Sequence, residues 1–323
     1  MSCNRSVGWC ESCKKIVGLN AVAGGHVCSA GHTVYKCQNG VLHDVCNRYH
    51  GAAGSLCGAC RLNRTIPDLS IAGHLQRWSR LESAKRRMLY DLELVGFHAD
   101  VENGPLPLRF DFKTDAVPQG DGRWQRLGNG QKVFTGHASG VITINVREAD
   151  SVEREINRVA LGEPQRTLIG HFRHEVGHYV WDVLIKDQPQ QLKAFTDVFG
   201  DPYQPAYGDA LKRHYAKGPP ADWPERFISP YASMHPWEDF AETWQAYLDI
   251  FGTLELLASY GWLHQQTAIA DLPARIDAYV RTGVSLNELN RNAGLLPLIP
   301  EMFSKPVREK LAQIHACLGS GSA

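Results

Sequence analysis

Apolar positions follow a helical period over most of the chain and a strand-like pattern in two short places. Between residues 75 and 95 they recur every three or four positions, which predicts an amphipathic helix. The runs 109–112 and 141–146 are rich in aromatic and β-branched residues and predict short strands. Glycines at 120–136 predict a loop-rich stretch or a hairpin. Because the pattern after Glu148 is again mostly helical, we predict an α+β fold that is mostly helical with a small β-sheet.

The first sixty residues differ from the rest because they carry nearly all of the cysteines. Eight of the nine lie there, at positions 3, 10, 13, 28, 37, 46, 57 and 60, together with four histidines and no long apolar run. A segment this short and polar buries little core, and bound metal is the stabilising element suited to a reducing compartment. Thr65–Asp68 predicts a linker or turn. We therefore expect a small metal module at 1–66 and a second domain at 67–323.

The segment from Thr167 to Trp181 carries the reactive residues of the second domain. Its apolar side chains recur every fourth position, which predicts a helix with a buried stripe. His174 and His178 are one turn apart and share a face, where two imidazoles can hold one Zn²⁺ at about 2.0–2.1 Å. Glu175 can take a proton from a water at the metal and pass it to a leaving amine. This is the His-Glu-x-x-His pattern of metallopeptidases.

His171 lies on a similar helix face, three residues before His174. The helix rises about 10 Å between His171 and His178, which is too far for both to bind one ion together with His174. We therefore predict that His171 is a second-shell or structural residue.

A third zinc ligand has to come from another segment, because a catalytic zinc takes three protein ligands and keeps one position open. The best candidate segment is 229–244, where Pro236 suits the first turn of a helix. Glu238 and Glu242 are four apart on one face of it, so one can bind the metal while the other accepts the N–H of a ligand histidine. Tyr231 could donate to the oxyanion that forms when water attacks a carbonyl.

Composition and charge exclude several classes of protein. The chain has 323 residues, and its 34 basic and 34 acidic side chains balance, so no global field favours nucleic acid or an anionic membrane. Residues 61–87 are a local exception, rich in Arg and Lys, and predict a solvated helix face or a docking surface. The start of the chain has no apolar signal region, and no apolar run reaches about 18 residues. We therefore expect a cytoplasmic protein without a membrane partner.

Several motifs spread over most of the chain match one known family. They are Cys57–Asn63, Thr65–Ser70, Ala84–Arg87, Thr135–His137, Gly140–Ile144, Gly170–Tyr179 and His235–Trp244. In these motifs the chain resembles a bacterial family of zinc-binding metallopeptidases with an N-terminal zinc-ribbon-like domain. The resemblance implies a zincin-like fold of the glutamate type.

The same resemblance implies roles in the 229–244 segment. In the anthrax lethal factor, a similar Glu-x-Phe-Ala-Glu stretch supplies the third ligand from its first Glu, with a catalytic Tyr seven residues earlier. Carried onto this sequence, that favours Glu238 as the ligand, Glu242 as second shell and Tyr231 as oxyanion donor. Glu242 or Asp239 remain alternatives to Glu238 as the ligand.

The ribbon departs from the family pattern, which usually opens with two Cys-x-x-Cys pairs. Here one such pair is intact and the earlier one is reduced to Cys3. The later half can hold one tetrahedral Zn²⁺ through Cys37, Cys46, Cys57 and Cys60. A second ion could be held by Cys10, Cys13, Cys28 and His32. We therefore expect zinc as cofactor, with one catalytic ion and one or two structural ions.

The leading hypothesis is a zinc-dependent peptidase with Glu175 as general base and a protein or peptide as substrate. An alternative is a binding protein, in which the ribbon and the basic run engage nucleic acid or a protein partner and the peptidase site is weak or vestigial. A third is a narrow processing enzyme whose ribbon selects the target. Glu175 favours an enzyme, because a purely structural zinc needs no base beside its ligand.

Overall fold

The computed structural model describes residues 8–22, 25–97, 99–118, 124–126, 133–150, 167–264, 271–297 and 299–320. Cys3 and the predicted loop glycines at 120–130 lie outside these residues. The chain divides into two compact units. The first consists of Met1–Tyr90, Asp100–Gly162 and Arg166–Phe172, and the second of Asp91–Ala99, Glu163–Gln165 and Arg173–Ala323. The domain boundary after residue 66 stays a prediction.

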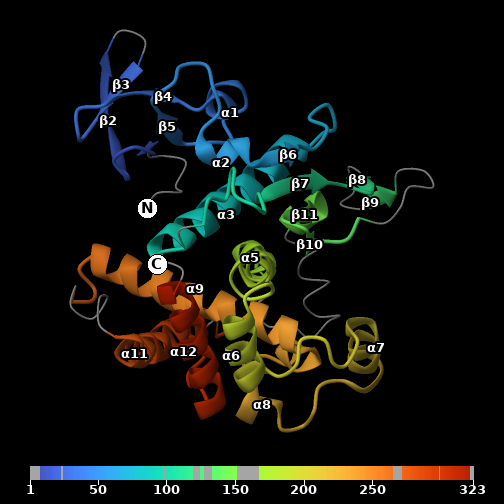
Figure 1. Cartoon of the computed structure of the whole chain (residues 1–323). Helices are drawn as coiled ribbons and strands as arrows, with labels where there is room; N and C mark the ends of the chain where they lie inside the picture. Colours follow the sequence, from blue (N-terminus) through green and yellow to red (C-terminus); the bar gives the residue numbers. More distant parts are fainter. Residues whose placement is uncertain are drawn as a thin grey trace. The chain divides into compact units, whose positions relative to one another are not determined.

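The cysteine-rich segment at the start of the first unit folds into a small closed barrel, drawn in blue in Figure 1. Its strands are β1 (Trp9–Cys10), β2 (Lys15–Val22), β3 (Gly25–Cys28), β4 (Thr33–Lys36) and β5 (Arg48–His50). Two short helices follow β4 and β5, namely α1 (Gln38–Leu42) and α2 (Gly58–Arg61). One buried cluster in this barrel contains only Cys10, Cys28 and Val34. A core this small agrees with the expectation that the segment needs bound metal.

The rest of the first unit places a four-stranded sheet beside a long helix. The sheet has the order β10-β11-β7-β6, and β8 and β9 form a separate two-stranded ribbon. The bounds are β6 (Asn63–Thr65), α3 (His74–Leu94), β7 (Arg109–Lys113), β8 (Ala116–Pro118), β9 (Trp124–Arg126), β10 (Gly136–Ala138), β11 (Val141–Asn145) and the 3₁₀ turn η1 (Val146–Ala149). The predicted helix at 75–95 and both predicted strands are confirmed. The α+β class is confirmed as well.

One sequence prediction in this region is wrong in part. Thr65 was expected in a linker, but it ends strand β6, because Asn63 and Thr65 pair with Phe110 and Asp111 of β7. Parallel pairing with a buried strand outweighs the polar character of these residues. Only residues 66–68 are irregular, as expected for a linker.

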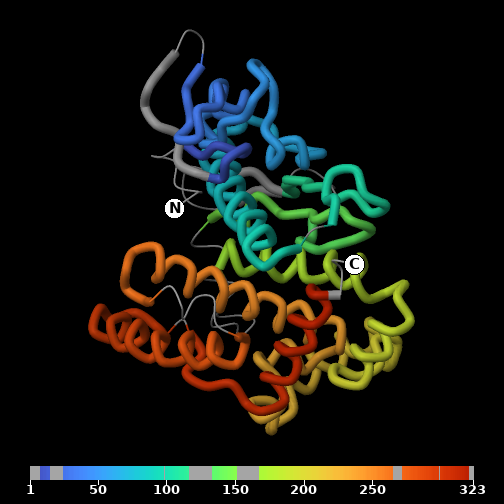
Figure 2. Tube along the Cα trace, turned by 60° about the vertical axis from the view of Figure 1, so that its left-hand side comes forward, coloured from blue at the N-terminus to red at the C-terminus, as the bar shows by residue number. Residues whose placement is uncertain are grey.

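The second unit is helical, drawn from yellow-green to red in Figure 2. Its helices are the part of α5 (Leu168–Leu184) from Arg173 on, α6 (Pro189–Phe199), α7 (Tyr207–Lys217), α8 (Trp223–Arg226), the 3₁₀ turn η2 (Tyr231–Met234), α9 (Pro236–Ser259), α11 (Leu272–Asn292) and α12 (Lys305–Ser320). Helix α9 is central, since α6, α11, α12 and η2 all pack against it. Its side chains Phe240, Trp244 and Leu248 are almost fully buried, so this face of α9 contributes to the core of the unit. None of the described helices is long and apolar enough to cross a membrane.

Helices α5 and α9 approach each other closely at Gly177. A Cβ added there would lie 3.0 Å from the Cα of Ala241 and 3.1 Å from the Trp244 ring, so a side chain does not fit without moving α9. The buried Arg173 guanidinium, four residues earlier, pairs with Asp91 at 2.7 Å and with Asp249 of α9. These two features hold together the helices that carry the candidate ligands.

Replacing Gly177 by Val is expected to destabilise the second unit by at least about 2 kcal/mol, because overpacking forces the two backbones apart. The same change should lower zinc retention at the site described below, since its ligands come from both helices. Denaturant unfolding and zinc content measure both effects. Gly208→Val is the matched control, because Gly208 is a helical glycine with nothing within 4 Å of its added Cβ. Equal stability of the two variants would contradict the close-approach argument.

Candidate metal centre

His174 and His178 lie one turn apart on α5 and turn their Nε2 atoms toward the same point. The two Nε2 atoms are 3.2 Å apart. The indole of Trp237 stacks on the His178 ring at 3.6 Å between centroids, which limits rotation of that imidazole. The His178 imidazole is therefore held in one orientation beside His174.

Glu238 joins this pair from the first turn of α9. The helix begins at Pro236, and His235 caps it by accepting the backbone N–H of Trp237 at 3.1 Å. Glu238 is 2% exposed, and its Oε2 lies 2.9 Å from Nε2 of His174 and 3.5 Å from Nε2 of His178. A solvated acidic helix face is thereby excluded for this residue.

The three donor atoms fit a zinc ion. Ligands about 2.0–2.1 Å from a tetrahedral zinc are separated from each other by about 3.3 Å. The observed separations of 2.9, 3.2 and 3.5 Å are close to that value. Two imidazoles and one carboxylate also form the donor set of a catalytic zinc that keeps one position open.

The neighbouring carboxylates of α9 are engaged in other contacts. Glu242 places Oε1 2.7 Å from Nδ1 of His174, and its Oε2 accepts the Ser229 hydroxyl at 2.7 Å. Asp239 pairs with Lys310 of α12 at 2.6 Å. Glu242 can thus orient the His174 imidazole through its Nδ1, the nitrogen opposite Nε2. Asp239 is engaged in an ion pair with Lys310 instead. Of the three candidates, Glu238 is the one that faces both imidazoles.

The other predicted residues take three different positions. Glu175 is half-buried on α5, and its charge is one of the causes that raise the pKa of Tyr207, after burial and the Glu238 charge. The Tyr231 ring lies 6.1 Å from the His174 ring between centroids. His171 instead belongs to the first unit, where its Nδ1 lies 3.3 Å from a Glu148 carboxylate oxygen. That contact is structural, and a second-shell role for His171 stays a prediction.

Sequence analysis missed Tyr207, the first residue of α7. Its hydroxyl donates to Oε1 of Glu238 at 2.8 Å. No spacing rule connects Tyr207 with a residue 31 positions later, so only the fold could identify it.

The electrostatics of this cluster favour positive charge at its centre. Burial opposes ionisation of His174, but hydrogen bonds with Glu238 and Glu242 raise the pKa of His174 well above its ordinary value. Burial, together with the Glu238 charge, raises the pKa of Tyr207 and of Tyr231. Both phenols therefore stay protonated near neutral pH and can act as hydrogen-bond donors.

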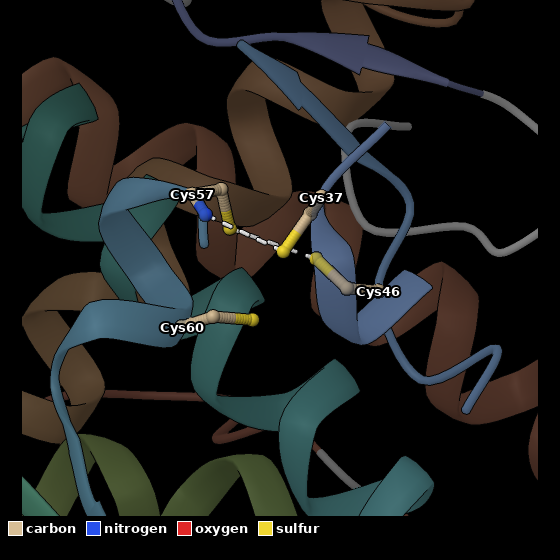
Figure 3. A group of neighbouring side chains, drawn as sticks. All are labelled: Cys37, Cys46, Cys57 and Cys60. Carbon is tan, nitrogen blue, oxygen red and sulfur yellow. Dashed lines mark hydrogen bonds between the residues drawn. The ribbon is translucent and has the colours of Figure 1, made fainter. Parts of the chain in front are cut away.

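The later cysteines of the ribbon form a second candidate metal site, shown in Figure 3. The sulfurs of Cys37, Cys46, Cys57 and Cys60 lie within 4.8 Å of one another, and all four residues are buried. The Cys46 and Cys57 sulfurs are 3.7 Å apart, against about 3.8 Å for ligands at about 2.3 Å from a tetrahedral zinc. Backbone N–H groups of Cys57 and Arg48 donate to two of these sulfurs. Such contacts orient thiolate ligands.

The surroundings of Cys46 favour its thiolate form. Hydrogen bonds from Cys37, Cys57 and Cys60 hold the pKa of Cys46 well below its ordinary value, and the Arg86 charge adds to this. Arg86 is fully buried on α3 and donates to the backbone oxygen of Val45 at 2.6 Å. A buried cation beside a metal–thiolate group offsets part of its negative charge.

The earlier ribbon residues form a third group. Cys10, Cys28 and His32 place one donor atom each within 4.8 Å of the others. The Cys13 thiol lies outside that group of three, but it contributes to the shifted pKa of both Cys10 and Cys28. Gly31, at φ +81°, makes the turn that brings His32 back to Cys28. Burial by itself would raise the pKa of the Cys28 thiol. The backbone N–H groups of Ala30 and His32, together with the nearby thiols, nevertheless lower that pKa to about 7.

Comparison with known proteins places the chain in a zinc-binding family. The family described as "Putative zinc-binding metallo-peptidase" matches residues 74–317, and a zinc-ribbon domain matches residues 1–71. The chain belongs to this metallopeptidase family. Uncharacterized proteins of Mycobacterium tuberculosis and Mycobacterium bovis are 38% identical to it over 275 residues, covering 81% of this chain and 75% of theirs. No solved structure matches the chain.

Two residues of the basic run at 61–87 differ from both sequence predictions. Lys85 and Arg86 have no exposed surface, and Lys85 donates to Glu82 at 2.9 Å. These two residues therefore form neither a solvated face nor a docking surface. Other cations of the run are paired within the first unit, as in the contacts Arg61–Glu102, Arg64–Asp111 and Arg77–Asp150.

Proposed function

We propose that this family member is a peptidase that hydrolyses peptide bonds at a zinc held by His174, His178 and Glu238. The observation that supports it best is the convergence of two imidazole nitrogens and one carboxylate oxygen at separations suited to one zinc. The donor set uses three positions of a tetrahedron, which leaves the fourth for the reacting groups.

Zinc bound there would supply Lewis-acid polarisation of the scissile carbonyl and increase the acidity of the attacking water. In this proposal Glu175 accepts the proton of that water and then delivers it to the leaving amine. Tyr231, whose phenol stays protonated, donates to the oxyanion. Glu242 holds His174 through Nδ1, which fixes the tautomer that offers Nε2 to the metal.

The ribbon would hold structural zinc rather than take part in the reaction. We propose one ion at Cys37, Cys46, Cys57 and Cys60, where four buried sulfurs leave no open position. A second ion would be held by Cys10, Cys28 and His32 with Cys13 as fourth ligand, after a small rotation of its thiol. The predicted cytoplasmic location suits both thiolate sites, because thiols stay reduced there.

Replacing Glu175 by Gln tests the peptidase proposal. The full chain is incubated with a peptide library from the proteome of its own organism, and new N-termini are counted by mass spectrometry. Wild type is expected to cleave, and Glu175→Gln to cleave at least about 10²–10⁴-fold more slowly, because the proton acceptor is lost. Zinc content should be equal in the two proteins, since Glu175 is not a ligand in this proposal.

Glu309→Gln is the matched control, because Glu309 is an exposed residue of α12 in the same unit. It should cleave like wild type. Cleavage by Glu175→Gln at the wild-type rate would contradict the role of the base. A zinc-loaded wild type that cleaves no peptide in the library would contradict the proposed activity itself.

A further inference from the structure

The hydroxyl of Tyr207 lies inside the candidate zinc site, although its ring reaches the surface. Tyr207 is 38% exposed, and its hydroxyl donates to Oε1 of the almost fully buried Glu238 at 2.8 Å. An exposed tyrosine at the start of a helix usually turns its polar tip to water. Here the tip is turned inward, toward a buried carboxylate.

The two oxygens of Glu238 are divided between different partners. Oε2 faces the Nε2 atoms of His174 and His178, and Oε1 faces the Tyr207 hydroxyl. Because Oε1 accepts the hydrogen bond of the Tyr207 hydroxyl, the carboxylate group is held from rotating, and Oε1 would not bind the metal. The carboxylate is therefore set to offer a single oxygen, Oε2, in a fixed direction. A buried carboxylate oxygen without this donor would be poorly solvated and free to reorient.

Aromatic contacts hold the Tyr207 ring in this orientation. The ring lies edge-on to His235 at 5.4 Å and to Trp237 at 5.8 Å, and Trp237 stacks on the ligand His178. His235 is also the N-cap of α9, and its Nε2 lies 3.2 Å from the backbone oxygen of Pro205. The segment just before α7 is thus tied to the turn of α9 that carries Glu238.

Glu238 also acts on the proposed oxyanion donor. Burial and the Glu238 charge raise the pKa of Tyr231, and the neighbouring Tyr207 adds to this. The same carboxylate therefore acts on both phenols, but among the described contacts only Tyr207 donates a hydrogen bond to it.

We infer that Tyr207 is a positioning residue of the zinc site: it fixes Glu238 as a one-oxygen ligand. The inference rests on the proposed function, because it concerns the same metal. It predicts an effect on zinc affinity before any substrate is present.

The test is zinc competition against a chromophoric chelator of known affinity, using the full chain and Tyr207→Phe. Loss of a partner that orients a ligand typically weakens metal affinity about 10–100-fold. We expect a loss of that size for one zinc per chain and no change for the ribbon zinc. Tyr203→Phe is the matched control, because Tyr203 is a nearby tyrosine that is 58% exposed, and it should bind zinc like wild type.

A double-mutant cycle separates positioning from a general structural effect. If Tyr207 acts through Glu238, then Tyr207→Phe added to Glu238→Gln should cost no further affinity. Wild-type affinity in Tyr207→Phe would overturn the inference. So would a loss that persists in the Glu238→Gln background, or a loss shared by the ribbon zinc. If wild type binds no more zinc than His174→Ala/His178→Ala, the proposed function fails instead.

Discussion

The double substitution His174→Ala/His178→Ala should remove about one zinc per chain and leave the remaining zinc in place. One ion is expected per group of three protein ligands, and two of the three donors are deleted. The Glu238 carboxylate that remains is a single ligand, which is too few to retain the ion. Elemental analysis of protein purified without added metal measures the change. The thermal unfolding midpoint of the second unit should fall with it, because bound ligand stabilises the folded state.

His264→Ala is the control for that experiment. His264 is an exposed histidine of the same unit, and its loss should leave the zinc content unchanged. If the double variant keeps all of its zinc, these histidines bind no metal and the peptidase proposal cannot stand. If it loses all of its zinc, the two units do not bind metal independently, which contradicts the assignment of separate catalytic and structural ions.

The second large effect is expected from Cys57→Ser/Cys60→Ser in the ribbon. Structural zinc in small modules binds with about 10–16 kcal/mol of apparent free energy, and this is largely folding free energy. A segment this short and polar buries too little apolar core to replace that contribution. We expect the variant to lose about one zinc per chain and to become sensitive to proteolysis between residues 8 and 60, while the helical unit keeps its zinc.

Cys317→Ser is the matched control for the cysteine variant. Cys317 is also a buried cysteine, at 3% exposed, but it lies in α12 and in none of the candidate metal groups among the described residues. It should keep full zinc content and an intact ribbon. Full zinc content in Cys57→Ser/Cys60→Ser, or the same protease sensitivity in both variants, would contradict a structural metal at this site.

Local pattern was sufficient for the elements and for part of the site. Apolar periodicity predicted α3 and helix α5, because burial of one face imposes a repeat that neighbouring residues reveal. Pro236 predicted the start of α9. The prediction of a linker failed at Thr65, where a partner strand nearly fifty residues away decides the conformation. His174 and His178 could be proposed as ligands from the sequence, because two histidines one turn apart on a single helix share a face whatever the fold.

The sequence by itself determined the helix that carries His174, Glu175 and His178, and it determined that a cysteine-rich module precedes it. Only the tertiary structure decided which carboxylate of α9 faces the histidines, because Glu238, Asp239 and Glu242 differ by rotation about one helix axis. It also brought in Tyr207 from α7 and directed Lys85 and Arg86 into the interior. Such contacts join residues far apart in the chain, and packing rather than any local rule sets them.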